Sequence, residues 1–372
     1  MYMVKTIFDP QYWSQVPFHF WSVVFFIFGS IVGSFLNVCI HRMPIGESVV
    51  SPPSHCPHCK YSIPWFLNLP LATWMYLGGK CRNCGAPISI RYFLVELLTA
   101  TVFCCCWFAF GHQSAWLALT YCVFLAGLIV ATFIDFEHFI IPDEITLGGI
   151  VVGFLLSFLL PSLHGAPAPL GGMKQSALGI AVGGGLIYAI LRIGKLLFGR
   201  LRIVVPDGAR VVFTETALHL PDEQFPYEEV FYRPSDTIRL HAEIVELVDR
   251  CYKDVAVRLS PSKLQIGEET LDPESVPHLE AVSAEIVLPR EAMGLGDVKF
   301  MAAIGAFLGW KAVLFSLMGS SLIGSFVGIT LILLRKQAWT SKLPYGPYIA
   351  LASAIWIFWG HDFVQWWFSG MR

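Results

Sequence analysis

The stretch Trp116-Leu-Ala-Leu-Thr-Tyr-Cys-Val-Phe-Leu-Ala-Gly-Leu-Ile-Val-Ala-Thr-Phe-Ile-Asp135 is uncharged and mostly apolar until it ends in a carboxylate. An apolar helix of about twenty residues is long enough to cross a bilayer. A second carboxylate, Asp297, lies in Met-Gly-Leu-Gly-Asp-Val-Lys (293–299), directly before another apolar run. Charged groups at membrane depth cost about 2.5–3.5 kcal/mol each, so they are rare and usually functional. These two aspartates are therefore the first candidates for a site.

The composition of the whole chain is that of a multi-span membrane protein. Of its 372 residues, 55% are hydrophobic and 14% are charged, against about 25% charged in an ordinary soluble domain. Apolar runs long enough to span occur at 17–40, 92–110, 116–134, 145–161, 175–191, 312–334 and 346–368. A shorter run, 298–310, is expected to span together with the glycine-rich segment before it, which predicts about eight transmembrane helices. The first run lacks a small-residue cleavage site, which favours a retained anchor over a signal peptide.

Loop charge predicts the orientation of these helices. Basic residues gather in three connections, namely Arg42, Lys60, Lys80, Arg82 and Arg91; Arg192, Lys195, Arg200 and Arg202; and Arg335, Lys336 and Lys342. The loops 111–115, 162–174 and 309–311 carry only Lys174 and Lys311. By the positive-inside rule the three basic connections are cytoplasmic and both termini lie outside. Asp135, ending the third helix, and Asp297, starting the sixth, then both face the cytoplasm. The net charge of −2 does not suggest a nucleic-acid partner.

Two carboxylates that meet can share one proton, so that one acts as a general base and the other as a general acid. An aspartyl protease activates water in this way. One hypothesis is therefore a protease that acts on membrane-anchored substrates. A hypothesis from a different class is a transporter or an assembly scaffold whose carboxylates carry protons or cations. That hypothesis predicts carboxylates near the bilayer midplane, whereas these two are expected at its cytoplasmic margin.

Four cysteines form two Cys-x-x-Cys motifs in the first basic connection. Cys56 and Cys59 are separated by 21 residues from Cys81 and Cys84. Four thiolates at this spacing can surround one Zn²⁺ tetrahedrally, and Gly85 suits the tight turn after the second pair. The sequence predicts a structural, non-catalytic zinc in a zinc-ribbon-like loop. Redox-active dithiols, or ligation by the histidines at 55 and 58, are the alternatives.

Other polar residues near the apolar runs have two interpretations each. Glu96 lies about one turn into the second helix and is a candidate for function, or a glutamate paired with Arg91. Asn37, in Gly-Ser-Phe-Leu-Asn-Val (33–38), needs a partner inside the bilayer, whereas Gly33 equally suits close helix packing. Asp143 is interpreted as an N-cap. The turn Pro-Tyr-Gly-Pro-Tyr (344–348) opens the last helix or lines a substrate channel.

Taken together, these motifs resemble those of the type IV prepilin peptidases, a family of Gly-x-Gly-Asp membrane aspartyl proteases. The similar elements, in family order, are Gly-Ser-Phe-Leu-Asn-Val with His-Arg-Met-Pro (41–44), the paired Cys-x-x-Cys motifs, Gly-Gly-Lys-Cys (78–81), Arg-Tyr-Phe-Leu-Val-Glu-Leu (91–97), Ile-Asp followed by Pro-Asp (134–143), Gly-Leu-Gly-Asp-Val-Lys (294–299) and Pro-Tyr-Gly-Pro-Tyr. They cover the chain except for 193–290.

The resemblance implies a multi-pass enzyme of the bacterial inner membrane with its active site facing the cytoplasm. It would cleave the leader of type IV prepilins or type II secretion pseudopilins after glycine. It would then N-methylate the new N-terminus with S-adenosylmethionine. The family's catalytic aspartates match Asp135 and Asp297, and the cysteine loop is associated with methylation. No glycine-rich Rossmann fingerprint marks the methyl-donor site, for which Glu96 is a candidate.

The segment 193–290 departs from the family pattern, in which a short loop joins these helices. It is rich in charge and in β-formers and is predicted to be a cytoplasmic domain of mainly β character. It is also predicted to be duplicated, because 218–230 parallels 264–276 at an offset of 46. The expected organisation is a first helix region (1–40), a cytoplasmic zinc loop (41–91), helices two to five (92–192), the inserted domain (193–290) and helices six to eight (291–372). Membrane lipids and a pilin-type protein are the expected partners.

Overall fold

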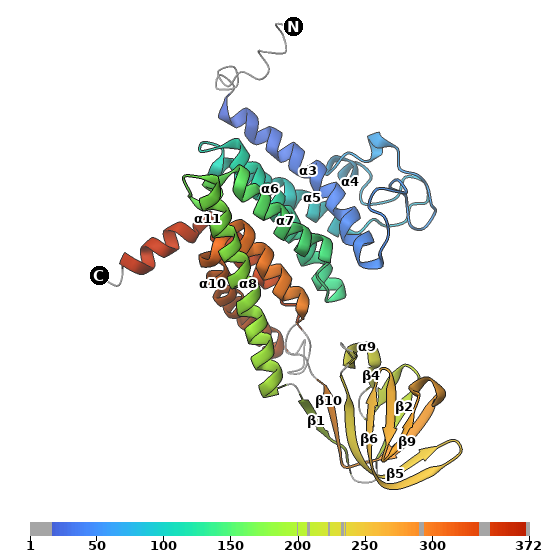
Figure 1. Ribbon diagram of the computed structural model, residues 1–372. Coiled ribbons are helices and arrows are strands. Elements are labelled where there is room, and N and C mark those ends of the chain that lie inside the picture. The colour runs from blue at the N-terminus through green and yellow to red at the C-terminus, as the bar shows by residue number, and fades with distance from the viewer. Residues whose placement is uncertain are drawn as a thin grey trace. The chain divides into compact units, whose positions relative to one another are not determined.

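The computed structural model describes residues 17–198, 200–206, 209–221, 224–231, 234, 236–289, 294–334 and 343–369. Met293 and the basic residues Arg335, Lys336 and Lys342, used above, lie outside this part. Long helices coincide with the apolar runs, namely α3 (Phe18–Arg42), α5 (Ile90–Phe110), α6 (Ala115–His138), α7 (Asp143–Leu159), α8 (Pro169–Phe198), α10 (Leu295–Leu333) and α11 (Gly346–Ser369) (Figure 1). Five of them, α3, α5, α6, α8 and α10, are long and apolar enough to cross a membrane. The prediction of a polytopic helical membrane protein is confirmed, but the count of eight spans is not.

Helix α10 is divided at Gly309, whose φ of 78° and ψ of 174° are not helical. The boundary between the apolar runs 298–310 and 312–334 lies at this point. Such a break frees backbone groups that must be satisfied inside the protein at membrane depth. The buried hydroxyl of Ser176 on α8 donates to the carbonyl of Ala306 at 2.9 Å. The buried hydroxyl of Ser157 on α7, whose nearest acceptor is the carbonyl of Gly153 at 2.7 Å, lies 3.4 Å from the same Ala306 oxygen. The break is therefore supported by side chains from α7 and α8.

Glycines bring two pairs of helices into backbone contact. A Cβ on Gly33 of α3 would lie 2.7 Å from the Cα of Glu96 on α5, and one on Gly29 would lie 2.8 Å from the Cα of Ala100. Between α8 and α10, a Cβ on Gly179 would lie 2.0 Å from the carbonyl oxygen of Gly305. Small residues at helix contacts are the usual basis of packing in membranes. The close-packing interpretation of Gly33 agrees with this geometry.

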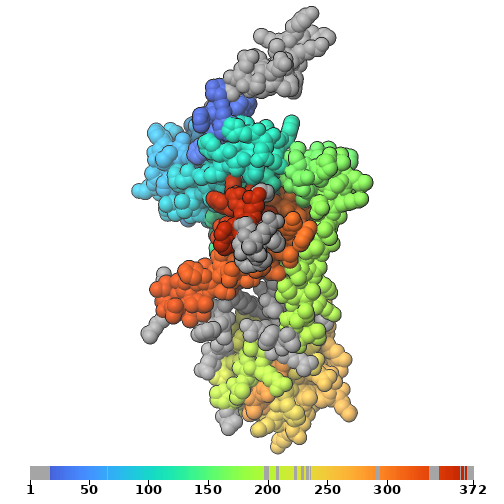
Figure 2. Space-filling model, turned by 90° about the vertical axis from the view of Figure 1, so that its left-hand side faces the viewer, coloured from blue at the N-terminus to red at the C-terminus, as the bar shows by residue number. Residues whose placement is uncertain are grey.

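The last helix packs against the second half of α10. Figure 2 shows α11 in red against α10 in orange. The hydroxyls of Ser316 and Ser353 lie 2.9 Å apart in this contact. The hydroxyl of Tyr345 lies 2.9 Å from that of Ser320 and 3.0 Å from that of Ser321. The start of α11 is thereby fixed by polar contacts as well as by apolar ones.

The chain divides into two compact units, and the smaller one, Tyr188–Gly294, contains the strands. They are β1 (Arg200–Val204), β2 (Arg210–Thr214), β3 (Ala217–His219), β4 (Gln224–Pro226), β5 (Ile238–Leu247), β6 (Cys251–Ser260), β7 (Lys263–Ile266), β8 (Glu269–Leu271), β9 (His278–Val282) and β10 (Glu285–Pro289). The sheet is antiparallel, and its alternate residues, among them Val211, Phe213 and Val245, form an apolar core. The inserted mainly β unit is thus present.

The order of the strands is symmetric about the β9–β5 pair. It reads β4-β3-β2-β9-β5-β6-β7-β8, with β10 paired to β1 and to β5. The first of the two similar sequence segments forms the hairpin β3–β4 and the short helix α9 (Tyr227–Val230). The second forms the hairpin β7–β8 and the 3₁₀ turn Pro273–Ser275. The two segments therefore occupy equivalent places at the two ends of the sheet.

Candidate active site

Asp135 lies on the last turns of α6 and is buried, with 6% of its surface exposed. One of its carboxylate oxygens, Oδ2, accepts a hydrogen bond of 2.8 Å from the backbone N–H of Gly346, the first residue of α11. A Cβ at position 346 would lie 2.7 Å from the same oxygen. Only glycine therefore lets the start of α11 approach this carboxylate, which explains the glycine of Pro-Tyr-Gly-Pro-Tyr.

Ile141 joins the ends of three helices. It lies in the connection between α6 and α7, and its Cδ1 would be 3.2 Å from a Cβ on Gly346. Its own Cβ would be 3.6 Å from a Cβ on Gly296, which immediately precedes Asp297 in the first turn of α10. The end of α6 and the starts of α10 and α11 thus meet around this side chain. Sequence reasoning did not identify Ile141 or the role of Gly346, because both act through contacts between distant segments.

An ion pair holds the start of α7 against the start of α10. The ammonium group of Lys299 lies 2.6 Å from Oδ1 of Asp143. The interpretation of Asp143 as an N-cap is wrong, since Pro142 occupies that position and α7 has no side-chain cap. Lys299 is therefore paired with Asp143, across the start of the two helices.

A second ion pair connects the start of α5 to the end of α6. Arg91 pairs with Glu137, two residues after Asp135. Arg91 therefore does not pair with Glu96, contrary to one interpretation of the sequence. Instead, Oε2 of Glu96 accepts a hydrogen bond of 2.7 Å from the backbone N–H of Leu71, in the connection between α3 and α5. Glu96 is 9% exposed and fixes part of that connection to the body of α5.

Two polar side chains of α3 form hydrogen bonds outside that helix, Asn37 with α5 and Arg42 with the connection that follows α3. The amide of Asn37 donates to the carbonyl of Tyr92 at 3.0 Å, so the residue does find a partner inside the helical unit. The guanidinium of Arg42 is buried and donates to the carbonyls of Ser48 at 2.9 Å and Pro52 at 2.8 Å. The connection after α3 is thus folded back onto the end of that helix.

The four cysteines predicted to bind zinc form one cluster. The sulfur atoms of Cys56, Cys59, Cys81 and Cys84 all lie within 4.8 Å of one another. Cys56 and Cys84 are 3.9 Å apart at Sγ, and Cys59 and Cys81 are 4.0 Å apart. A tetrahedral Zn²⁺ with Zn–S bonds of about 2.3 Å requires S···S distances of about 3.8 Å. The donor set and its spacing fit a structural zinc ion with no open coordination position.

Both Cys-x-x-Cys motifs adopt the same backbone fold. In the first, the N–H of Lys60 donates to the carbonyl of Cys56 at 2.9 Å, and in the second, the N–H of Gly85 donates to that of Cys81 at 2.9 Å. Lys60 and Gly85 both have positive φ, 56° and 71°. Glycine adopts this conformation without strain, as the sequence analysis expected for Gly85.

Hydrogen bonding lowers the pKa of two of these cysteines, whereas desolvation and the neighbouring sulfurs raise the pKa of Cys84 to about 11. The side-chain amide of Asn83 and the backbone near Tyr61 lower the pKa of Cys59 to about 6. Backbone donors at Cys84 and Asn83 likewise lower the pKa of Cys81. The thiolate is the form that ligates a metal. This electrostatic environment therefore suits a cation at the centre of the cluster.

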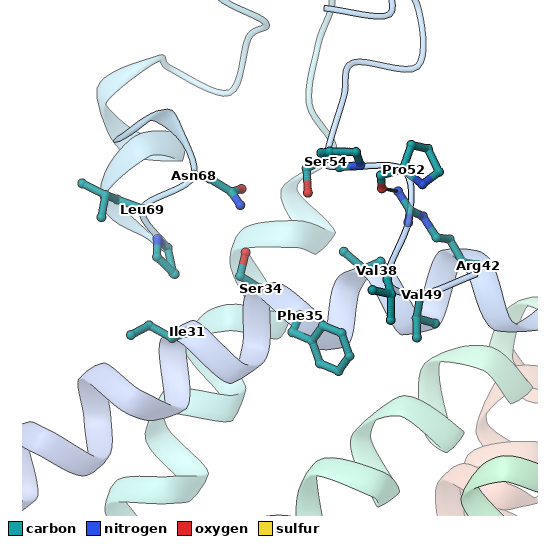
Figure 3. Close-up of a pocket in the computed structure, with 13 residues that line it drawn as sticks. Ile31, Ser34, Phe35, Val38, Arg42, Val49, Pro52, Ser54, Asn68 and Leu69 are labelled. Atoms are coloured by element: carbon teal, nitrogen blue, oxygen red, sulfur yellow. Dashed lines mark hydrogen bonds between the residues drawn. The ribbon is translucent and has the colours of Figure 1, made fainter. Parts of the chain in front are cut away.

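A cavity of about 360 Å³ lies between α3 and the folded-back connection. Most of its walls are apolar, and its polar side chains are Ser34, Ser54, Asn68 and Arg42. Figure 3 shows Ser34 pointing from α3 toward the loop and Asn68 reaching into the same space. Its volume is within the range of small-molecule sites.

Two protein-family models match this chain, and the matched residues include the cysteine cluster and both aspartates. The bacterial peptidase A24 N-terminal domain matches residues 27–110, which include the cysteine cluster and Glu96. The type IV leader peptidase family matches residues 122–201 and 279–329, which include Asp135 and Asp297. Together the two matches cover more than half of the chain. The chain belongs to the type IV leader peptidase family.

Curated members of the leader peptidase family extend this similarity. A prepilin leader peptidase/N-methyltransferase of Aeromonas hydrophila is 29% identical over 378 residues, covering 95% of this chain and 96% of that protein. One of Myxococcus xanthus is 38% identical over 173 residues, covering 46% of this chain and 49% of that protein. A type 4 prepilin-like proteins leader peptide-processing enzyme of Escherichia coli is 36% identical over 197 residues, covering 48% and 70%. No solved structure matches the chain significantly.

The geometry of the cysteine cluster predicts the zinc content of this leader peptidase homologue. Purified protein should contain about one zinc ion per chain, because four thiolates at this spacing form a closed tetrahedral site. Replacing both Cys56 and Cys81 by serine should remove the metal. Elemental analysis of the two proteins measures this. The matched control is Cys104→Ser with Cys105→Ser, two cysteines on α5 outside the cluster, which should keep the metal. Zinc retained after replacement of all four cluster cysteines would contradict the site.

Proposed function

We propose that this chain is a prepilin leader peptidase and N-methyltransferase. Its similarity to proteins of that name extends over 95% of its length, and it belongs to their family. The observation that supports the peptidase chemistry best is the buried carboxylate of Asp135, which accepts a hydrogen bond from the N–H of Gly346. Ile141 lies against both Gly346 and Gly296, the residue before Asp297. The chemistry is hydrolysis of the leader, followed by methylation of the exposed amino group.

In the proposed mechanism the two aspartates share one proton. One carboxylate takes a proton from water, which attacks the scissile carbonyl, while the other donates a proton to the departing amine. The N–H of Gly346 occupies one oxygen of Asp135 and thereby leaves the other for water or substrate. Gly296, next to Asp297, lacks a side chain, so an extended peptide backbone can approach closely there.

We also propose that this site faces the cytoplasm of the inner membrane and that the chain crosses the membrane eight times. The eight spans are α3, α5, α6, α7, α8, the two halves of α10 divided at Gly309, and α11. This division supports the count, because a 39-residue helix is about twice the length that a bilayer needs. The basic residues in the connections beside the site support its cytoplasmic side.

Replacing either aspartate by asparagine should abolish leader cleavage. Asp135→Asn and Asp297→Asn keep the shape of the side chain but cannot exchange the proton, so the rate should fall at least about a hundredfold. The measurement is cleavage of a prepilin by purified protein in proteoliposomes. Asp143→Asn is the matched control, because it removes only the ion pair to Lys299 and should retain most of the activity. Full cleavage by either of the first two variants would exclude the pair as the catalytic residues.

The proposal for methylation assigns the methyl donor to the cavity beside the cysteine loop. S-adenosylmethionine supplies the methyl group, and it carries an aromatic base, hydroxyls and a carboxylate. The cavity offers apolar walls, the hydroxyls of Ser34 and Ser54, the amide of Asn68 and the guanidinium of Arg42. Arg42 donates two of its N–H groups to loop carbonyls. A guanidinium has five N–H donors, so the others can bind the carboxylate of the methyl donor. The zinc, in this proposal, keeps the loop folded over the cavity.

Filling this cavity should separate the two activities. Asn68→Trp places a large ring in the space into which Asn68 reaches, so methylation should fall at least about tenfold, a loss of about 1.4 kcal/mol in transition-state binding. Leader cleavage should be nearly unchanged, because the aspartates lie on other elements. The control is Asn68→Ser, which leaves the space open. Transfer of a labelled methyl group to a cleaved prepilin measures the effect, and equal transfer by both variants would place the donor elsewhere.

We propose further that residues 193–290 form an accessory cytoplasmic domain that arose by duplication. The family match is interrupted between 201 and 279, and the segment contains neither Asp135 nor Asp297 nor any cysteine of the cluster. The symmetric strand order supports duplication. Its first and last strands, β1 and β10, pair with each other, and Arg200 is opposite Pro289, so that the two ends of the domain are neighbours.

Excision of the domain tests this assignment. Joining the residues before β1 to those after β10 by a short linker should leave an inserted protein with measurable peptidase activity, because the ends are already adjacent. Cleavage is compared on a full-length prepilin and on a short leader peptide. A loss of kcat/KM confined to the prepilin would show that the domain binds the substrate. Loss of activity on both substrates with normal insertion would show that it is required for the active site.

A further inference from the structure

The segment Ile63–Leu77, between the two Cys-x-x-Cys motifs, has the composition of a membrane-contacting element. Its fifteen residues, Ile-Pro-Trp-Phe-Leu-Asn-Leu-Pro-Leu-Ala-Thr-Trp-Met-Tyr-Leu, contain no charged side chain. It forms a 3₁₀ turn, Trp65–Leu67, and the short helix α4 (Ala72–Tyr76). A connection that only joined two metal-binding turns in water would not need such a composition.

Two contacts fix the depth of this segment along α5. The N–H of Leu71 is bonded to Glu96, which lies six residues into the helix that begins at Ile90. At a rise of 1.5 Å per residue, this contact is about 9 Å inside the start of the helix. The ring of Trp74 lies 5.2 Å from that of Phe93, between centroids. The segment therefore lies beside the first two turns of a membrane-spanning helix and not beyond its end (Figure 1).

The outer surface of the segment is apolar and exposed. Met75 is 60% exposed and Tyr76 is 81% exposed, and Phe66 and Leu69 are each about half exposed. On α5, Leu94 and Leu98 are also exposed near the level of Glu96. On α3, the exposed Ile31 and Phe35 line the cavity that Leu69 also lines. The apolar surface of the segment thus continues the surface that these helices present to lipid.

The remainder of the connection has the charge that suits a membrane surface. Residues 41–91 contain five lysines and arginines and one acidic residue, Glu47. Of the basic residues, Lys60, Lys80 and Arg82 are exposed and lie in or beside the two cysteine motifs. Basic residues next to an apolar surface are attracted to anionic phospholipids.

We propose that segment 63–77 lies in the headgroup region of the membrane, with Met75, Tyr76 and Phe66 in contact with lipid. Glu96 is a positioning residue that holds the segment at this depth through Leu71. The partner is a phospholipid surface. Because segment 63–77 joins the two Cys-x-x-Cys motifs, its contact with lipid also holds the cysteine cluster at the membrane surface. This inference does not depend on which reaction the protein catalyses.

Photo-crosslinking of the full chain tests the proposal. A diazirine-bearing amino acid is introduced at Met75 or Tyr76, and the protein is reconstituted in nanodiscs of phosphatidylethanolamine and phosphatidylglycerol. Ile27, exposed on α3 and outside the cavity lining, is the reference position for lipid contact, and His58, exposed in the first cysteine motif, is the matched position in the same connection. After irradiation, mass spectrometry should find phospholipid adducts at 75 and 76 in yields close to that at 27 and well above that at 58.

Two further measurements make the test decisive. Glu96→Ala removes the acceptor for Leu71 and should lower the adduct yield at position 75, whereas Glu96→Gln retains an acceptor oxygen and should restore it. An unchanged yield in Glu96→Ala would overturn the positioning role of Glu96. Lipid adducts at 27 but none at 75 or 76 would overturn the proposal. Adducts at 75 joining two copies of the chain would overturn it in favour of self-association.

Discussion

The hydrogen bond from Gly346 to Asp135 is the interaction around which the helical unit is arranged. A carboxylate buried at the end of a membrane helix needs a donor, because neither lipid nor apolar side chains can supply one. The backbone of α11 supplies it over a distance that excludes any side chain at position 346. This contact brings α11 against α6, and Ile141 then extends the contact to the start of α10. The segments of the candidate site, far apart in sequence, therefore meet because one polar group has to be satisfied.

The same requirement explains the other polar contacts of the unit. The hydroxyl of Ser176 donates to the carbonyl that the break at Gly309 frees, and the amide of Asn37 donates to the carbonyl of Tyr92. Both of these side chains bind a backbone group on a neighbouring helix. Glycines make these approaches possible, since α3 and α5, like α8 and α10, touch through backbone atoms. Packing without side chains at the contact leaves little freedom to shift one helix along another, so the positions of the helix ends are well defined.

Sequence patterns predicted the elements better than the contacts between them. Apolar runs indicated each long helix, and the boundary between 298–310 and 312–334 coincides with the break at Gly309. Cysteine spacing predicted a single cluster because a tetrahedral site constrains only the local turns. Asp143 was misinterpreted because an N-cap is a local inference, whereas its partner Lys299 is 156 residues away. The contacts of Glu96 and Ile141 could not be predicted for the same reason. Periodicity and local motifs carry no information on which distant backbone group will be adjacent.

The pairing of β1 with β10 has a consequence for the synthesis of this protein. The chain leaves α8 and returns to α10 through two antiparallel strands that lie side by side, so the strand unit is connected to the helices at a single place. During translation, α8 can enter the membrane before any strand is made, and the sheet cannot close until β10 has emerged. Since β10 directly precedes α10, completion of the sheet and delivery of the next hydrophobic helix to the insertion machinery are successive events. An inserted domain of this kind separates two successive hydrophobic helices by a fixed length of chain and leaves their order unchanged.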